Sequence, residues 1–118
     1  MIAKFLIDTN VLVYAYDLAT PQKQHQALAV LDQLIATETG SLTTQILAEF
    51  FVTVTRKLAT PLSVAEAYIR IENLLLSWPI LEMSGLVILE AVRGVRDHQL
   101  SYWDAQIWAT ARVAIKYL

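Results

Sequence analysis

Charged residues are sparse in three long stretches of this 118-residue sequence, and each stretch carries one isolated carboxylate. The acids are Asp8 within residues 5–16, Glu49 within residues 39–55 and Asp104 within residues 99–111. Segments this apolar are expected to be buried, and burying an unpaired carboxylate is unfavourable by several kcal/mol. No Lys or Arg lies three or four residues from Glu49 or Asp104, where a helix would bring it alongside. Each acid therefore needs compensation from elsewhere.

The composition excludes several classes of protein. With 56% hydrophobic and 17% charged residues, the chain is too apolar to be disordered and has apolar surface to offer a partner. A net charge of −2 is not the basic excess of general nucleic-acid binders. The absence of cysteine removes disulfides, thiolate zinc sites and cysteine nucleophiles. With no signal peptide and no run of about 18 apolar residues, we expect a cytoplasmic protein without a membrane span.

Hydrophobic periodicity predicts strands that alternate with helices. Strands are expected at residues 3–8, 41–43 and 79–83, and helices at 22–36, 44–58, 63–77, 84–97 and 102–117. Gly40 is expected to end the first helix, and Thr44 to cap the second. A Ser63-x-x-Glu66 capping box starts the third. This order predicts a single α/β domain over residues 1–118, a three-layer α/β/α sandwich around a central parallel sheet.

Apolar side chains at helical spacing predict which helix faces are buried. The predicted stripes are Ile46, Phe50, Val54 and Leu58 on one helix, and Leu86, Leu89, Ala91 and Val92 on another. The helix at 63–77 and the following Trp78 are the candidate surface for self-association, most simply as a homodimer, because a domain this small and apolar cannot hide every hydrophobic side chain.

The predicted topology brings the three acids toward one place. Asp8 ends the first strand, Glu49 lies in the first turns after the second, and Asp104 begins the last helix. In open parallel sheets, ligands bind beyond the carboxyl ends of the strands, and we expect the three acids to meet there. Crowded carboxylates repel unless a cation neutralises them. Oxygen ligands without His or Cys favour Mg²⁺ or Mn²⁺, which are used in phosphoryl chemistry.

Each acid also has an ordinary structural interpretation. Asp8 would cap the turn after its strand, Glu49 would be a solvated helix residue, and Asp104 would complement a helix dipole. A shared cation explains all three at once. Similarly, Arg93 and Arg96 either hold an RNA backbone or are ordinary surface charge.

Three segments, FLIDTNVLVYAY, TTQILAEFFVTVTRK and LSYWDAQIWATA, resemble the three acidic motifs of the PIN domain family, and most closely those of VapC-type toxins of bacterial toxin–antitoxin pairs. The resemblance covers nearly the whole chain. It implies a Mg²⁺-dependent endoribonuclease with Asp8, Glu49 and Asp104 as catalytic residues and metal ligands. It also implies an RNA substrate, a cognate antitoxin that blocks the site, and supporting roles for Asn10 and Thr44.

The sequence departs from this family in one respect. Family members usually continue into a further strand and a fourth acidic residue, so we expect the final strand of the sheet to be missing from this chain. The alternative function is a non-catalytic PIN-like module that binds RNA or protein. A phosphatase with Asp8 as nucleophile would need a second acid where Asn10 stands. A nucleotide-binding fold would need a Gly-rich turn after Asp8.

Overall fold

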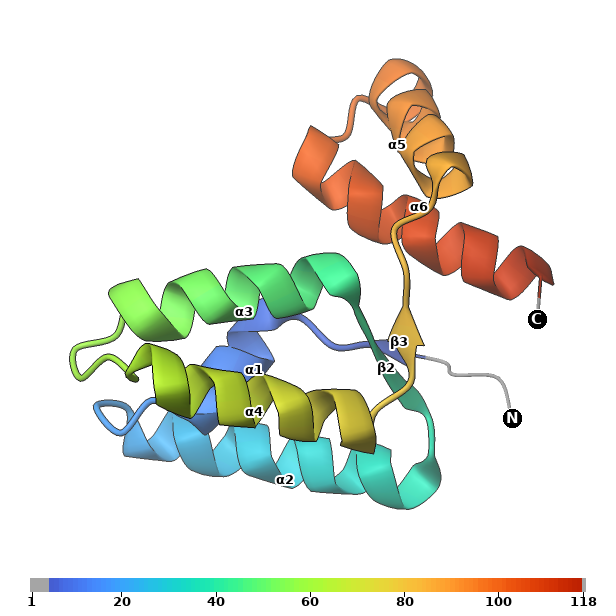
Figure 1. Ribbon diagram of the computed structural model, residues 1–118. Helices are drawn as coiled ribbons and strands as arrows, with labels where there is room; N and C mark the ends of the chain where they lie inside the picture. Colours follow the sequence, from blue (N-terminus) through green and yellow to red (C-terminus); the bar gives the residue numbers. More distant parts are fainter. Residues whose placement is uncertain (1–4, 118) are drawn as a thin grey trace. The chain divides into compact units, whose positions relative to one another are not determined.

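The computed structural model describes residues 5–117, which form an α/β fold with a parallel three-stranded sheet flanked by helices (Figure 1). The elements are β1 (Phe5–Leu6), α1 (Thr9–Ala15), α2 (Pro21–Thr37), β2 (Gly40–Thr43), α3 (Thr44–Arg56), α4 (Val64–Ser77), β3 (Ile80–Leu81), α5 (Gly85–His98) and α6 (Tyr102–Tyr117). The predicted fold class is confirmed. None of the helices in this range is long and apolar enough to cross a membrane.

The chain divides into two compact units, with residues 5–80 in the N-terminal unit and residues 81–117 in the C-terminal unit. In the N-terminal unit α1 packs against α2 and α3, and α3 packs against α4. In the C-terminal unit α5 packs against α6. The expectation of one domain over residues 1–118 stays a prediction.

The sheet is built around the parallel pairing of β1 with β2. Phe5 lies opposite Gly40 and Leu6 opposite Ser41, and the N–H of Ile7 donates to Ser41 O at 3.1 Å. The strand order is β1-β2-β3. The three predicted strands are confirmed. The first and third are shorter than predicted, and the second begins one residue earlier, at Gly40. The predicted start of the first strand at residues 3 and 4 lies outside the described residues. All four residues of β2 are buried, as expected for a strand covered on both faces.

Helix α3 follows β2 without a loop. Thr43 is its N-cap, with extended backbone and a side-chain oxygen that accepts from the N–H of Ile46 at 3.0 Å. The sequence predicted Thr44 as the cap, one residue too late. Two adjacent threonines are chemically equal as caps, and only the backbone angles distinguish them. Three members of the predicted stripe are confirmed, because Ile46, Phe50 and Val54 are fully buried. The fourth, Leu58, lies beyond the end of α3 at Arg56 and is only partly buried.

Helix α1 is absent from the sequence prediction. Its residues include the β-branched Thr9, Val11 and Val13, which favour strands. Packing against α2 and α3 overrides that preference. Helix α4, by contrast, begins as predicted at a complete capping box, in which the N–H and hydroxyl of Ser63 hold the pKa of Glu66 below its usual range.

The apolar face predicted for α5 is confirmed at Ala91 and wrong at its other three positions. Leu86, Leu89 and Val92 are exposed, whereas the buried residues of this helix are Val87, Ala91 and Gly94. The prediction followed the large hydrophobic residues of this helix. Close contact with α6 instead requires small side chains on the buried face. A Cβ on Gly94 would lie 2.9 Å from the Trp108 ring. The core of the C-terminal unit consists of Val87, Ala91, Ala105 and Ala109, with Met83, Leu100 and Trp108 packed against it.

Gly40 lies in β2 and does not end α2 as predicted, because Glu38 forms the left-handed C-cap of that helix. A Cβ on Gly40 would lie 2.8 Å from Cζ3 of Trp78 and 3.2 Å from Cβ of Leu34. The glycine therefore allows the Trp78 ring to lie directly on the sheet backbone.

We predict that Gly40→Ala lowers the free energy of unfolding by about 1–3 kcal/mol through overpacking. Gly85→Ala is the matched control, since no atom lies within 4 Å of the added Cβ, and it should raise stability by roughly 0.5 kcal/mol. Urea denaturation measures both variants. A Gly40→Ala variant as stable as the parent would contradict the close contact with Trp78.

Candidate functional site

Asp8 stands where β1 ends and α1 begins. Its backbone is extended, and its Oδ1 accepts a hydrogen bond from the N–H of Asn10 at 3.2 Å. The side chain is exposed. Asp8 therefore caps the turn after its strand, which is the ordinary structural role considered for it in the sequence. The cap uses one carboxylate oxygen and leaves the other available for a ligand.

Glu49 lies on α3 and is half-buried. Its Oε2 accepts a hydrogen bond from the hydroxyl of Thr9 at 3.2 Å, across 40 positions of the sequence. Thr9 follows Asp8 directly and is buried. The structure therefore brings the turn that carries Asp8 next to Glu49, at the carboxyl end of β1.

Asp104 lies in the first turn of α6, in the C-terminal unit. Its N–H donates to Ser101 Oγ at 3.1 Å, and its carboxylate is exposed. Its place at a helix N-terminus is as predicted. Within the described residues, no group of three or more His, Cys, Asp or Glu side chains is arranged to hold a metal ion. The meeting of Asp104 with Asp8 and Glu49 stays a prediction.

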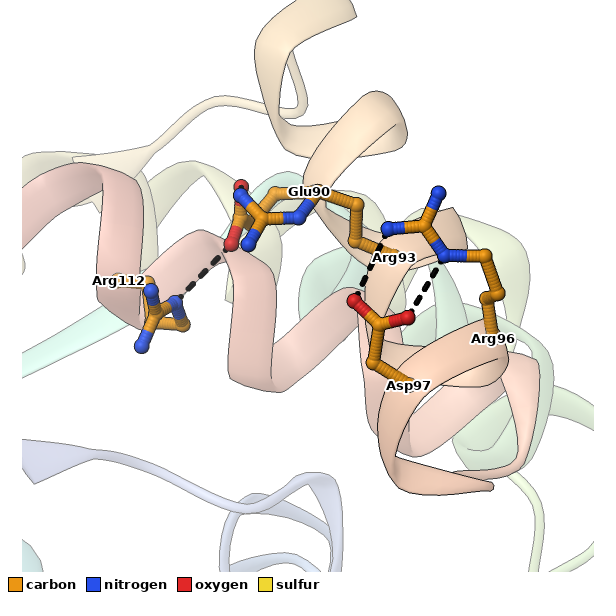
Figure 2. A network of polar contacts seen from close by, with 5 residues as sticks. All are labelled: Glu90, Arg93, Arg96, Asp97 and Arg112. Atoms are coloured by element: carbon orange, nitrogen blue, oxygen red, sulfur yellow. Dashed lines mark hydrogen bonds and ion pairs between the residues drawn. The ribbon is translucent and has the colours of Figure 1, made fainter.

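No cation compensates the three acids among the side chains that the structure describes. The ion pairs found there join Glu90 with Arg93 at 3.2 Å, Glu90 with Arg112 at 3.1 Å and Asp97 with Arg96 at 2.7 Å (Figure 2). All of them lie in the C-terminal unit. Arg93 and Arg96 thus have carboxylate partners, which favours the interpretation of ordinary surface charge over RNA binding.

Two neutral polar residues were also predicted to support the acids. Asn10 is exposed in the first turn of α1, and Thr44 is the first, half-buried residue of α3. Their supporting roles stay predictions. Thr9, whose hydroxyl donates to Glu49, was not predicted, because no local pattern links two residues 40 positions apart.

The arrangement suits a hard divalent cation. Asp8 and Glu49 offer carboxylate oxygens from two adjacent elements, and neither forms an ion pair with a Lys or Arg among the described side chains. Mg²⁺ and Mn²⁺ prefer such oxygen ligands and are bound through one or two carboxylates and water. The residues present therefore fit the predicted metal, with Asp8 and Glu49 as its protein ligands in the N-terminal unit.

We predict that Thr9→Val lowers the free energy of unfolding by about 1–2 kcal/mol, because the partly buried Glu49 carboxylate loses a hydrogen-bond donor. Thr9→Ser keeps the hydroxyl and should retain most of the stability. The same loss of orientation should weaken Mn²⁺ binding in the Val variant, measured by calorimetry. Equal stability and equal Mn²⁺ affinity of the Val variant and the parent would refute this role.

The family described as PIN domain matches residues 5–114, a range that runs through both units and contains all three acids. A search of curated proteins finds no match.

Proposed function

Because the chain belongs to the PIN domain family, we propose that it is a Mg²⁺- or Mn²⁺-dependent endoribonuclease, the VapC-type toxin of a toxin–antitoxin pair. PIN domains are generally nucleases and typically bind divalent metals. The observation that carries the proposal is the half-buried carboxylate of Glu49, which is joined through the Thr9 hydroxyl to the turn that bears Asp8. The Glu49 carboxylate is fixed by this hydrogen bond and has no basic partner among the described side chains, so its negative charge is available to a cation.

In this proposal Asp8, Glu49 and Asp104 hold the metal. When bound, the cation lowers the pKa of a water molecule and offsets negative charge on the phosphate oxygens. Thr9 keeps Glu49 in one orientation, and the partial burial of Glu49 strengthens its electrostatic interactions with a bound reactant. The Asp8 turn is fixed by its bond to the Asn10 N–H, so that the free oxygen of Asp8 is presented without further rearrangement.

The proposed partners are an RNA substrate and a cognate antitoxin, and the proposed location is the cytoplasm. The second candidate, a non-catalytic PIN-like binding module, is separated from the first by metal binding, because its acids would have no cation to hold. Self-association is also proposed, through the exposed apolar side chains of α4: Val64, Tyr68, Ile69, Leu75 and Leu76. Trp78 was predicted to belong to this surface, but it does not, because its side chain is buried against Gly40.

We predict that Asp8→Asn and Glu49→Gln each reduce Mn²⁺-dependent RNA cleavage by at least about 100-fold, because one charged ligand is lost. The fold should be retained. Asn caps helices as well as Asp does, and Gln at position 49 still accepts from Thr9. Asp104→Asn should have the same effect on cleavage if the three acids share the metal.

The control is Asp32→Asn, which removes an exposed carboxylate from the middle of α2. Cleavage rates on a mixed RNA substrate and Mn²⁺ titrations are measured for all variants and the parent. Equal cleavage by the Asp8 or Glu49 variant and the Asp32 variant would overturn the assignment. A parent that binds no Mn²⁺ would favour the binding module.

For self-association, we predict a dimer in sedimentation equilibrium at micromolar concentration. Leu76 has 83% of its surface exposed, and Leu76→Lys should shift the equilibrium toward the monomer, because the charge would be desolvated in the interface. Leu28→Lys, on the exposed face of α2, is the control. A monomeric parent would instead leave the apolar surface of α4 to another partner, such as the antitoxin.

A further inference from the structure

The N-terminal unit has a surface hollow between α1 and α2, with a volume of about 260 Å³. Cavities that hold drug-sized ligands typically measure about 300–1,000 Å³, so this hollow has room for one small planar group. Two residues of α1 and four of α2 line it: Val11, Tyr14, Lys23, Gln26, Ala27 and Val30.

Helix α1 connects the hollow to the candidate metal site. The N–H of Val11 donates to the carbonyl oxygen of Asp8 at 3.1 Å, so the wall of the hollow begins one turn after Asp8. Tyr14 follows after another three residues. With a rise of about 1.5 Å per residue, these two positions lie about 5 Å and about 9 Å beyond Asp8 along the helix axis. An RNA strand bound at Asp8 and Glu49 is therefore able to place a nearby base in the hollow.

Lys23 supplies a positive charge to the hollow. Its Nζ lies 4.9 Å from the centroid of the Tyr14 ring and 3.4 Å from the Tyr14 hydroxyl. It forms no ion pair among the described side chains, and the carboxylate of Asp17, in the loop between α1 and α2, accepts from the N–H of Ala19 instead. Lys23 also lies in the first turn of α2, which contains no acidic residue and where the helix dipole itself favours anions. This wall of the hollow is therefore suited to a phosphate group.

The remaining walls suit a nucleobase. Val11, Ala27 and Val30 offer apolar surface to the flat face of a base. The exposed amide of Gln26 offers a donor and an acceptor to its polar edge. Sites for single-stranded nucleic acid combine such surfaces with aromatic rings and cations. A purely apolar protein segment would fill the hollow but leave Lys23 without an anion.

We propose that this hollow is a nucleotide-binding subsite for the RNA substrate, an inference that rests on the proposed function. One base of a single strand lies between α1 and α2, and the ammonium group of Lys23 binds its phosphate. A lysine ammonium has three donors, and the Tyr14 hydroxyl accepts one of them, so two remain for phosphate oxygens. The subsite positions the RNA and takes no part in the chemical step.

The first test compares Lys23→Gln with Lys57→Gln, which removes an exposed lysine from the C-terminal end of α3. Binding of a short, fluorescein-labelled single-stranded RNA of mixed sequence is measured by anisotropy in EDTA, and its cleavage is measured in Mn²⁺. We expect Lys23→Gln to weaken binding and raise KM by about fivefold, with kcat within about twofold of the parent. The slope of log affinity against log salt concentration should become shallower by about 0.7. Lys57→Gln should change none of these quantities.

The second test compares Val30→Glu, which places a carboxylate in the hollow, with Leu28→Glu. Val30 is 47% exposed and Leu28 is 44% exposed on the same helix, so both variants should keep the melting temperature of the parent. We expect Val30→Glu to weaken RNA binding by about tenfold, because the base loses its contact surface. Leu28→Glu should bind RNA as the parent does.

The outcomes separate this inference from the proposed function. If the parent cleaves RNA, and Lys23→Gln and Val30→Glu keep its affinity and KM, the subsite is refuted, the nuclease assignment stands and the hollow is left to a protein segment. A parent that binds RNA through Lys23 and Val30 but does not cleave it in Mn²⁺ would support the subsite and overturn the nuclease activity. A parent that neither binds nor cleaves RNA would overturn both.

Discussion

The parallel pairing of β1 with β2 decides where the acid-bearing segments of the N-terminal unit lie. Both strands run in the same direction and in a fixed register, from Phe5 opposite Gly40 to Ile7 bonded to Ser41. The chain that leaves each strand must therefore emerge at the same edge. One strand is followed by Asp8 and Thr9, and the other by Thr43 and the start of α3. Thr9 and Glu49, which are 40 positions apart, become neighbours in this way, and we interpret the hydrogen bond between them as a consequence of the register.

Much of the fold follows from local patterns in the sequence. Residue spacing alone predicts the capping box of α4 and the buried Ile46, Phe50 and Val54 of α3, and both are confirmed. Local patterns fail where neighbours in space decide the outcome. Helix α1 forms from β-branched residues because α2 and α3 cover it. The buried face of α5 follows the contact between Gly94 and Trp108, and the hydrophobicity of its own residues gives no indication of that contact.

The candidate site divides in the same way. Asp8 and Glu49 were found because a charge in an apolar segment is conspicuous in sequence, and the structure places them on adjacent elements. Thr9 carries no charge, and nothing in its own segment marks it. It is identified by a hydrogen bond across the fold. That bond depends on what surrounds the side chain in three dimensions.

The two units differ in how their cores are filled. The N-terminal unit buries Leu12, Ile46 and Phe50, whereas the described buried side chains between α5 and α6 are one valine and three alanines. Since hydrophobic stabilisation scales with the apolar area removed from water, we expect this described part of the α5–α6 hairpin to open locally at a lower free energy than the N-terminal core. Asp104 begins one of these two helices. A ligand that binds Asp104 only when the hairpin is folded stabilises the folded hairpin. Part of its binding free energy is then used to keep α5 and α6 together.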